Sequence, residues 1–223
     1  MIGRVVYLHT VLSLTGLFAD LSKELLSAEI DVIHIADELL LRNIQIQGGL
    51  SPAVHRRVAE HAIAAEQAGA IAFQCTCSSI SPCVDTVRSM VGIPVLKIDE
   101  PMVDEALRIG TRVGVIATAP TTLKPTTDLV LSRSAELGRP VQVESVLCEG
   151  AYAALFAGNI SGHDAIVWEY VKNLADRSDV LILAQASMAR VVEVFSPDTV
   201  RVPILTSPRL AIKRLADVLN SPT

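Results

Sequence analysis

Short apolar runs alternate with amphipathic segments along almost the whole of this 223-residue chain. Eight runs have the length of buried strands, and they cover residues 5–8, 29–35, 70–75, 95–98, 112–117, 141–146, 180–183 and 202–205. Between the runs, apolar residues recur at spacings of three and four, which predicts helices over residues 53–68, 121–136, 164–174 and 208–219. Strands that alternate with helices pair in parallel through crossover connections. We therefore expect an α/β protein.

The predicted strands fit two sheets of four better than one closed barrel, because the crossovers are uneven and the chain is short for a barrel. Pro101 stands at a predicted helix start, where a second unit repeats the rhythm of the first. We expect an N-terminal α/β lobe of residues 1–98 plus 207–223 and a C-terminal α/β lobe of residues 99–206. Each lobe should hold a mostly parallel four-stranded sheet flanked by helices. Since ligands bind beyond the carboxyl ends of parallel strands, we expect the active site in the cleft between the lobes.

Charge and composition exclude several classes of protein. The net charge is -5, aromatic residues make up 4% of the chain, and no basic cluster exceeds the pair Arg56-Arg57, so we expect no nucleic-acid partner. The apolar helix faces and a mean hydropathy of +0.44 favour a homo-oligomer, in which a partner subunit covers apolar surface.

The N-terminal apolar stretch is not expected to be a targeting segment. His9 and Ser13 interrupt it, no A-x-A cleavage pattern follows, and no other run reaches the length of a membrane span. Four cysteines in a chain of this size need no disulfide scaffold, so we expect a cytoplasmic protein with no membrane association. The Cys75-x-Cys77 pair lacks a second ligand pair for zinc, and phosphate-binding glycine motifs are missing, so we expect neither a metal site nor a nucleotide cofactor.

Small polar side chains follow four of the predicted strands. Hydroxyl groups and the free backbone N–H groups of helix starts can hold a carboxylate without a full positive charge. We therefore expect a small-molecule carboxylate substrate. The candidate substrate-binding residues are His9, Thr10, Thr76, Ser78, Ser79, Thr118, Thr121, Thr122 and Ser187.

Cys77 is the thiol best placed for chemistry. It lies just before the helix start marked by Pro82, where the local field is expected to lower the pKa of a thiol. Strand alternation puts Cys75 on the same side, but Cys77 is closer to the helix start. The alternative is that both cysteines are ordinary buried hydrophobic residues. For Cys83, inside the predicted helix, we expect a packing role.

Other candidate residues have equally plain structural interpretations. Thr121 is either a ligand donor or an N-cap that follows Pro120. His9 is an acid, a ligand contact or a buried histidine whose hydrogen bonds are satisfied. The acidic pair Asp99-Glu100 is expected to be a solvated set of helix-start charges.

Three segments resemble the aspartate/glutamate/hydantoin racemase superfamily. They are Thr76-Cys77-Ser78-Ser79, the run 114–118 (Gly-Val-Ile-Ala-Thr) with Thr121 and Thr122, and the run 179–185 (Asp-Val-Leu-Ile-Leu-Ala-Gln). They occur in the family's order across essentially the whole chain. The resemblance implies two pseudo-symmetric α/β domains with a central cleft, no metal or organic cofactor, and one catalytic cysteine from each half. Cys77 then belongs to the N-terminal lobe, and Thr118 and Gln185 belong to the C-terminal lobe.

The chain departs from the family pattern at its second cysteine. That cysteine would fall at Gln185, or at Ala186 if the register slips by one, and neither side chain is a thiol. A racemase with two bases removes a proton from one face of a carbon and supplies one to the other face, which a glutamine amide cannot do. Ser187, His9 and Cys148 are the residues that could take over the vacant role.

The resemblance leaves three hypotheses, with Cys77 and Gln185 as the candidate catalytic residues. The first is a cofactor-independent racemase or isomerase in which a cysteine moves a proton beside the carboxylate or carbonyl of a small acid, amino acid or hydantoin-like substrate. The second is a one-base decarboxylase or lyase, or a cis-trans isomerase whose thiol adds to a double bond. The third is a carboxylate-binding protein without catalytic activity, in which Gln185 donates hydrogen bonds to the ligand.

Overall fold

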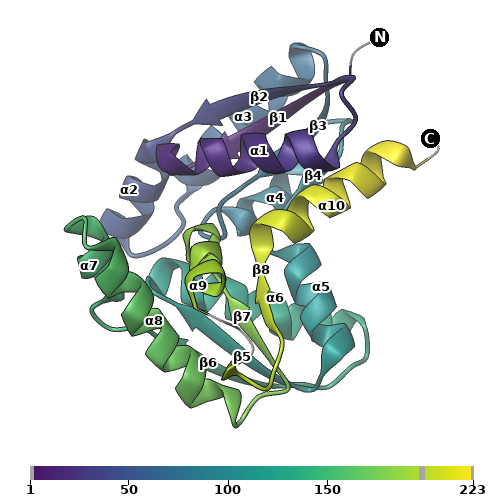
Figure 1. Cartoon of the computed structure of the whole chain (residues 1–223). Helices are drawn as coiled ribbons and strands as arrows, with labels where there is room; N and C mark the ends of the chain where they lie inside the picture. Colours follow the sequence, from purple (N-terminus) through teal and green to yellow (C-terminus); the bar gives the residue numbers. More distant parts are fainter. Residues whose placement is uncertain (1–2, 196–198, 222–223) are drawn as a thin grey trace. The chain divides into compact units, whose positions relative to one another are not determined.

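The computed structural model describes residues 3–195 and 199–221 (Figure 1). The chain forms two compact units, one of residues 1–98 with 208–223 and the other of residues 99–207. Each unit holds one four-stranded parallel sheet with helices around it. The expected α/β class and the two four-stranded sheets are thereby confirmed.

The first unit has the strand order β2-β1-β3-β4. Its strands are β1 Gly3–His9, β2 Ile30–Ala36, β3 Ala70–Cys75 and β4 Val95–Leu96. Its helices are η1 Leu12–Leu14, α1 Thr15–Leu25, α2 Glu38–Gln47, α3 Pro52–Gln67, α4 Ser81–Val87 and, from residue 208 onward, α10 Ser207–Asn220. Since the strands are all parallel, their carboxyl ends lie along one edge of the sheet.

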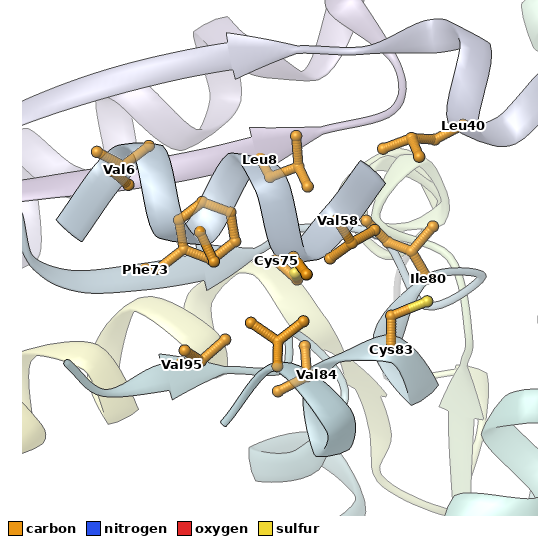
Figure 2. Packing of buried hydrophobic residues seen from close by; sticks show 14 of the residues in the cluster. Val6, Leu8, Leu40, Val58, Phe73, Cys75, Ile80, Cys83, Val84 and Val95 are labelled. Carbon is orange, nitrogen blue, oxygen red and sulfur yellow. The ribbon is translucent and has the colours of Figure 1, made fainter. Parts of the chain in front are cut away.

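One face of this sheet is covered by α2, α3 and α4 (Figure 2). Phe73 and Cys75 of β3 point into a cluster with Leu40 of α2, Val58 of α3 and Val84 of α4, and all five side chains are fully buried. Burial of each large apolar side chain contributes about 1.5–3 kcal/mol, so this cluster holds β3 and its end firmly in place.

Two contacts attach α1 to the rest of the first unit. The hydroxyl oxygen of Tyr7, on β1, lies 2.8 Å from that of Ser22 on α1. Arg209 of α10 donates to both carboxylate oxygens of Glu24 on α1, each at 2.8 Å. The last helix of the chain is therefore fastened to the first.

The second unit repeats the same strand order as β6-β5-β7-β8, again with parallel pairs throughout. Its strands are β5 Arg112–Ala117, β6 Gln142–Leu147, β7 Val180–Leu183 and β8 Ile204–Thr206. Its helices are α5 Glu100–Ile109, α6 Pro120–Glu136, α7 Ala151–Phe156, α8 Ile160–Ala175, η2 Ala186–Met188 and α9 Ala189–Val194. By position in the sheet, β5 matches β1 and β7 matches β3.

The main apolar cluster of the second unit lies between its sheet and the helices α7, α8 and α9. Ile116 of β5 and Leu183 of β7 pack there with Val171 of α8 and Val191 of α9, and all four side chains are fully buried. The cluster fixes the ends of β5 and β7 in the same way as the first cluster fixes the end of β3.

Two details around residues 95–99 differ from the predictions. The strand predicted over 95–98 ends at Leu96, because Lys97 turns to Asp85, with its Nζ 2.7 Å from the carboxylate. Asp99, expected to be solvated, is fully buried, so that prediction is wrong. Asp99 is the N-cap of α5, and its neighbours Ile98 and Met102 are also fully buried, so this helix starts in the interior.

Candidate active site

Cys77 lies at the carboxyl edge of the first sheet, two residues after β3 ends, and its side chain is partly exposed. Polar groups of Thr10, Ser79 and Ile80 lie close enough to its sulfur to lower its pKa, and among the described residues the buried hydroxyl of Thr10 makes no hydrogen bond. Thr10 follows β1, the strand next to β3, so the sheet itself brings this hydroxyl to the thiol.

The pKa of Cys77 is higher than that of an ordinary thiol. Burial raises this pKa, and the nearby polar groups of Thr10, Ser79 and Ile80 offset only part of the rise. The prediction of a lowered pKa is therefore wrong. Polar groups near the helix start do stabilise the thiolate, but the loss of its hydration by burial destabilises it by more. The resting side chain is a thiol, which suits it to donating a proton.

His9 is buried at the end of β1, and protein partners occupy both of its ring nitrogens. Its Nδ1 lies 2.8 Å from the hydroxyl oxygen of Thr76, and its Nε2 lies 2.8 Å from Nδ1 of His34 on β2. Burial and the neighbouring His34 lower the pKa of His9 to about 4. His9 is therefore a neutral imidazole at pH 7, and the structure places it inside the edge with its nitrogens already engaged.

Asp37, which follows β2, brings a carboxylate to the same edge. Its backbone N–H donates to the carbonyl of His9, and its Oδ2 accepts from Nε of Arg57 and lies 2.8 Å from Nε2 of His61. Burial raises the pKa of Asp37, but the hydrogen bonds from Arg57 and His61 outweigh it and the net pKa is lowered. Sequence analysis missed this group, because Arg57 and His61 lie on α3, some twenty residues further along the chain.

The carboxyl edge of the second sheet carries Gln185, directly after β7 and Ala184. Its amide oxygen lies 2.6 Å from the backbone nitrogen of Thr118 and 2.9 Å from the Thr118 hydroxyl. A backbone N–H can only donate, so the amide oxygen must face Thr118 and the NH₂ group must point away from it. Within residues 3–195 and 199–221, that NH₂ group has no hydrogen-bond partner, and Gln185 presents it as a donor.

The other predicted residues of the second unit surround this edge. Thr118 is buried and uses both its N–H and its hydroxyl to orient Gln185. Thr121 is not an N-cap, since Ala119 holds that position, and among the described residues its buried hydroxyl has no partner. Thr122 is buried in the first turn of α6, and Ser187 lies partly exposed in η2.

The remaining cysteines are packing residues of the two cores. Cys75 and Cys83 are fully buried in the first cluster (Figure 2), and Cys148 is buried in the second. Burial, the largest cause in each case, raises the pKa of Cys83 and that of Cys148 to about 12. The packing role expected for Cys83 agrees with its burial.

A buried charged group that sequence analysis missed lies near Gln185 along the chain. On α9, Arg190 donates through Nη2 to Asp164 at 2.7 Å, and the same carboxylate oxygen lies 2.8 Å from Nδ1 of His163. His163 and Asp164 belong to the first turns of α8. The only sign of this group in the sequence was the presence of two polar residues, His163 and Asp164, at the start of the mostly apolar segment that forms α8.

Two general properties bear on the kind of site. Among the residues described, no three His, Cys, Asp or Glu side chains gather closely enough to hold a metal ion. No helix in the described part of the chain is both long and apolar enough to cross a membrane.

In fold, the chain matches solved racemase structures. It has a TM-score of 0.76 and 15% identity with a candidate Asp/Glu racemase from Yersinia pestis, covering 98% of this chain and 100% of that one. It has a TM-score of 0.72 and 21% identity with a glutamate racemase from Francisella tularensis (98% and 81% covered), and 0.71 and 15% with an allantoin racemase from Klebsiella pneumoniae (97% and 87%). Identities this low establish the common fold alone.

A family model described as Asp/Glu/Hydantoin racemase matches residues 13–215, so the chain belongs to that family. The resemblance seen in the sequence is thereby confirmed. A search of curated protein sequences finds no match. Membership of this family supports an isomerase-type enzyme.

Proposed function

We propose that the protein is a cofactor-independent enzyme in which Cys77 is the only thiol that exchanges a proton with the substrate. The substrate is a small acid, an amino acid or a hydantoin-like compound, and the proton moves at the carbon beside its carboxylate or carbonyl. Gln185 does not act as a base. It donates a hydrogen bond to the oxygen on which negative charge develops.

The hydrogen bonding of Gln185 carries this proposal. Gln185 stands where the family pattern has its second cysteine, and Thr118 holds its amide oxygen at 2.6 and 2.9 Å. An amide neither gains nor loses a proton near neutral pH, but a fixed N–H donor stabilises an enolate or enediolate oxygen. The second half of the protein would thus have exchanged proton transfer for oxyanion stabilisation.

The surroundings of Cys77 support its role as the proton carrier. The thiol is partly exposed, whereas Cys75, Cys83 and Cys148 are buried. Once Cys77 has given up its proton, the polar groups of Thr10, Ser79 and Ile80 stabilise the thiolate that remains. These groups favour departure of the proton, whereas burial of the sulfur favours its return.

Incubation in D₂O with glutamate, aspartate, allantoin and α-substituted malonates tests the proposal. We expect deuterium to enter the substrate carbon from one face, by exchange or by protonation, and NMR measures this incorporation. The reaction should be lost in Cys77→Ala. Cys83→Ala, which removes a buried thiol from the same unit, is the matched control and should keep the reaction. Inversion at the usual rate in Cys77→Ala would overturn the proposal.

A one-base decarboxylase or lyase is the second candidate, favoured by the raised pKa of Cys77. Such an enzyme needs a thiol that is protonated at rest, because its task is to protonate the enediolate left when carbon dioxide departs. We expect iodoacetamide to alkylate Cys77 more slowly at pH 7 than it does free cysteine. Release of carbon dioxide from malonates without exchange on amino acids would select this candidate, and exchange without carbon dioxide would exclude it.

A further inference from the structure

Three side chains from neighbouring strands form a continuous hydrogen-bonded row across the carboxyl edge of the first sheet. His34 of β2 meets His9 of β1 at 2.8 Å, His9 meets Thr76 at 2.8 Å, and the Thr76 hydroxyl reaches the carbonyl of Leu8 at 3.0 Å. Thr76 directly follows β3, so the row crosses from β2 through β1 to the segment that carries Cys77.

The number of available protons decides how this row is arranged. The Leu8 carbonyl accepts from the backbone N–H of Thr76 at 3.0 Å, and the single hydrogen of the Thr76 hydroxyl is donated to the same carbonyl. With that hydrogen in use, the Thr76 hydroxyl accepts from Nδ1–H of His9. His9 is neutral, so its Nε2 carries no proton and needs a donor, which is Nδ1–H of His34. The opposite tautomer of His9 would leave the contact between the Thr76 hydroxyl and Leu8 without a proton.

Aromatic rings keep the two imidazoles in place. The ring of Tyr7 meets the ring of His34 edge-on at 5.3 Å and that of His9 at 6.1 Å, and Phe18 of α1 lies 5.4 Å from His9. His9 is 1% exposed, whereas His34 is only partly buried. His34 is therefore the outer end of the row.

We propose that His34 is a positioning residue, whose Nδ1–H selects the tautomer of His9 and so holds Thr76 and Thr10 in the orientation that Cys77 requires. Thr10 directly follows His9, and its buried hydroxyl stabilises the thiolate form of Cys77, while Thr76 directly precedes Cys77. One imidazole thus governs both neighbours of the thiol. The effect on turnover rests on the function proposed above, whereas the tautomer of His9 does not.

Three substitutions at position 34 test this proposal. His34→Asn keeps an N–H donor close to the original Nδ1, His34→Asp offers only acceptors, and His34→Leu offers neither. The His9 tautomer is measured at pH 8 by ¹⁵N–¹H correlation spectra of the imidazoles, with His9→Gln used to assign its signals among the five histidines. His55→Asn, on α3 and outside the row, is the control.

We expect the Nδ1–H tautomer of His9 in the wild type and in His34→Asn, and the Nε2–H tautomer in His34→Asp. Alkylation of Cys77 by iodoacetamide should slow about threefold to fivefold in His34→Asp and His34→Leu, but less than twofold in His34→Asn and His55→Asn, as for the loss of one ordered hydrogen bond. Turnover should follow the same order.

The outcomes separate the two proposals. An Nε2–H tautomer in the wild type, or equal alkylation rates in all variants, overturns the role of His34 whether or not any substrate is turned over. The expected tautomers and alkylation rates without turnover on any tested substrate would instead count against the proposed function alone.

Discussion

The two sheets share a strand order, and polar groups follow the same strands in both. The two sheets differ in the group that follows the third strand of this order, a thiol after β3 and an amide after β7. In the first unit, the threonine after β1, Thr10, lies near Cys77 beyond β3 and lowers the pKa of that thiol. In the second, the threonine after the matching β5, Thr118, donates to the amide of Gln185 beyond the matching β7. The comparison teaches that a threonine follows the matching strand in both units and that the neighbouring group differs, a thiol in one and a side-chain amide in the other.

Removal of the thiol should have the largest effect. In Cys77→Ser we expect turnover to fall at least about a thousandfold, because a serine hydroxyl is too weak an acid to exchange a proton readily with carbon. Turnover per folded molecule is the measurement, with circular dichroism as the check on folding. An equal loss in Gln185→Ala would make the two edges equivalent and would remove the distinction drawn here.

Acid should weaken the first edge and leave its counterpart unaffected. His9 has a pKa of about 4 in the folded protein, below its ordinary 6.5, so the unfolded chain binds more protons between these values. The free energy of unfolding should then fall as pH drops from 6.5 to 4, by up to about 3 kcal/mol, with no further contribution from His9 below pH 4. The matching position of the second unit, before Thr118, is Ala117.

Denaturant titrations of the wild type and His9→Gln at several pH values measure this effect. His9→Gln is expected to start less stable but to lose less on acidification. Parallel stability curves for the two proteins between pH 6.5 and pH 4 would mean that His9 does not titrate as described.

Restoring a thiol to the second edge should sharpen the comparison further. With Gln185→Cys we expect racemisation with deuterium incorporation to rise about a hundredfold above wild type, since a second acid–base group contributes a factor of this order. Gln185→Asn, which keeps an amide, is the control. If Gln185→Cys and Gln185→Asn had the same racemisation rate, position 185 would not be the place of the second acid–base group.

The supporting threonines should give the smallest effects. Thr10→Val should slow alkylation of Cys77 about fivefold, because the thiolate loses one donor, whereas Thr118→Val should leave that rate unchanged. Thr118→Val should instead raise KM, since Gln185 loses the 2.9 Å contact that helps to orient it. If Thr10→Val and Thr118→Val changed the alkylation rate equally and also changed the KM equally, the two threonines would not act separately.

The sequence predicted the strands well where an apolar run ends abruptly in polar residues. The strands at 70–75, 112–117 and 180–183 were placed to the residue, since a polar residue follows each run within two positions. The run at 95–98 was overestimated, because its composition does not reveal that Lys97 turns to Asp85. The shorter helices α7 and α9 have too few turns for a periodic signal.

Individual site residues could be predicted, but their contacts could not. Cys77, Thr118 and Gln185 follow strand ends, which the pattern locates. The bonds from Thr118 to Gln185 and from His9 to His34 join residues 67 and 25 positions apart, and depend on a strand order that sequence alone leaves open. The direction of the Cys77 pKa failed for a similar reason, because burial is a property of the packed fold.

The ion pair between Arg209 of α10 and Glu24 of α1 has a consequence for the order in which the two units are completed during synthesis. The second unit is one uninterrupted stretch, complete once residue 207 has left the ribosome, whereas the first lacks α10 until later. In the finished protein Ala211, Ile212 and Leu215 of α10 are buried. Until α10 has left the ribosome, the surface that these residues cover is exposed to water. The half of the protein that is translated first is thus the last to be finished.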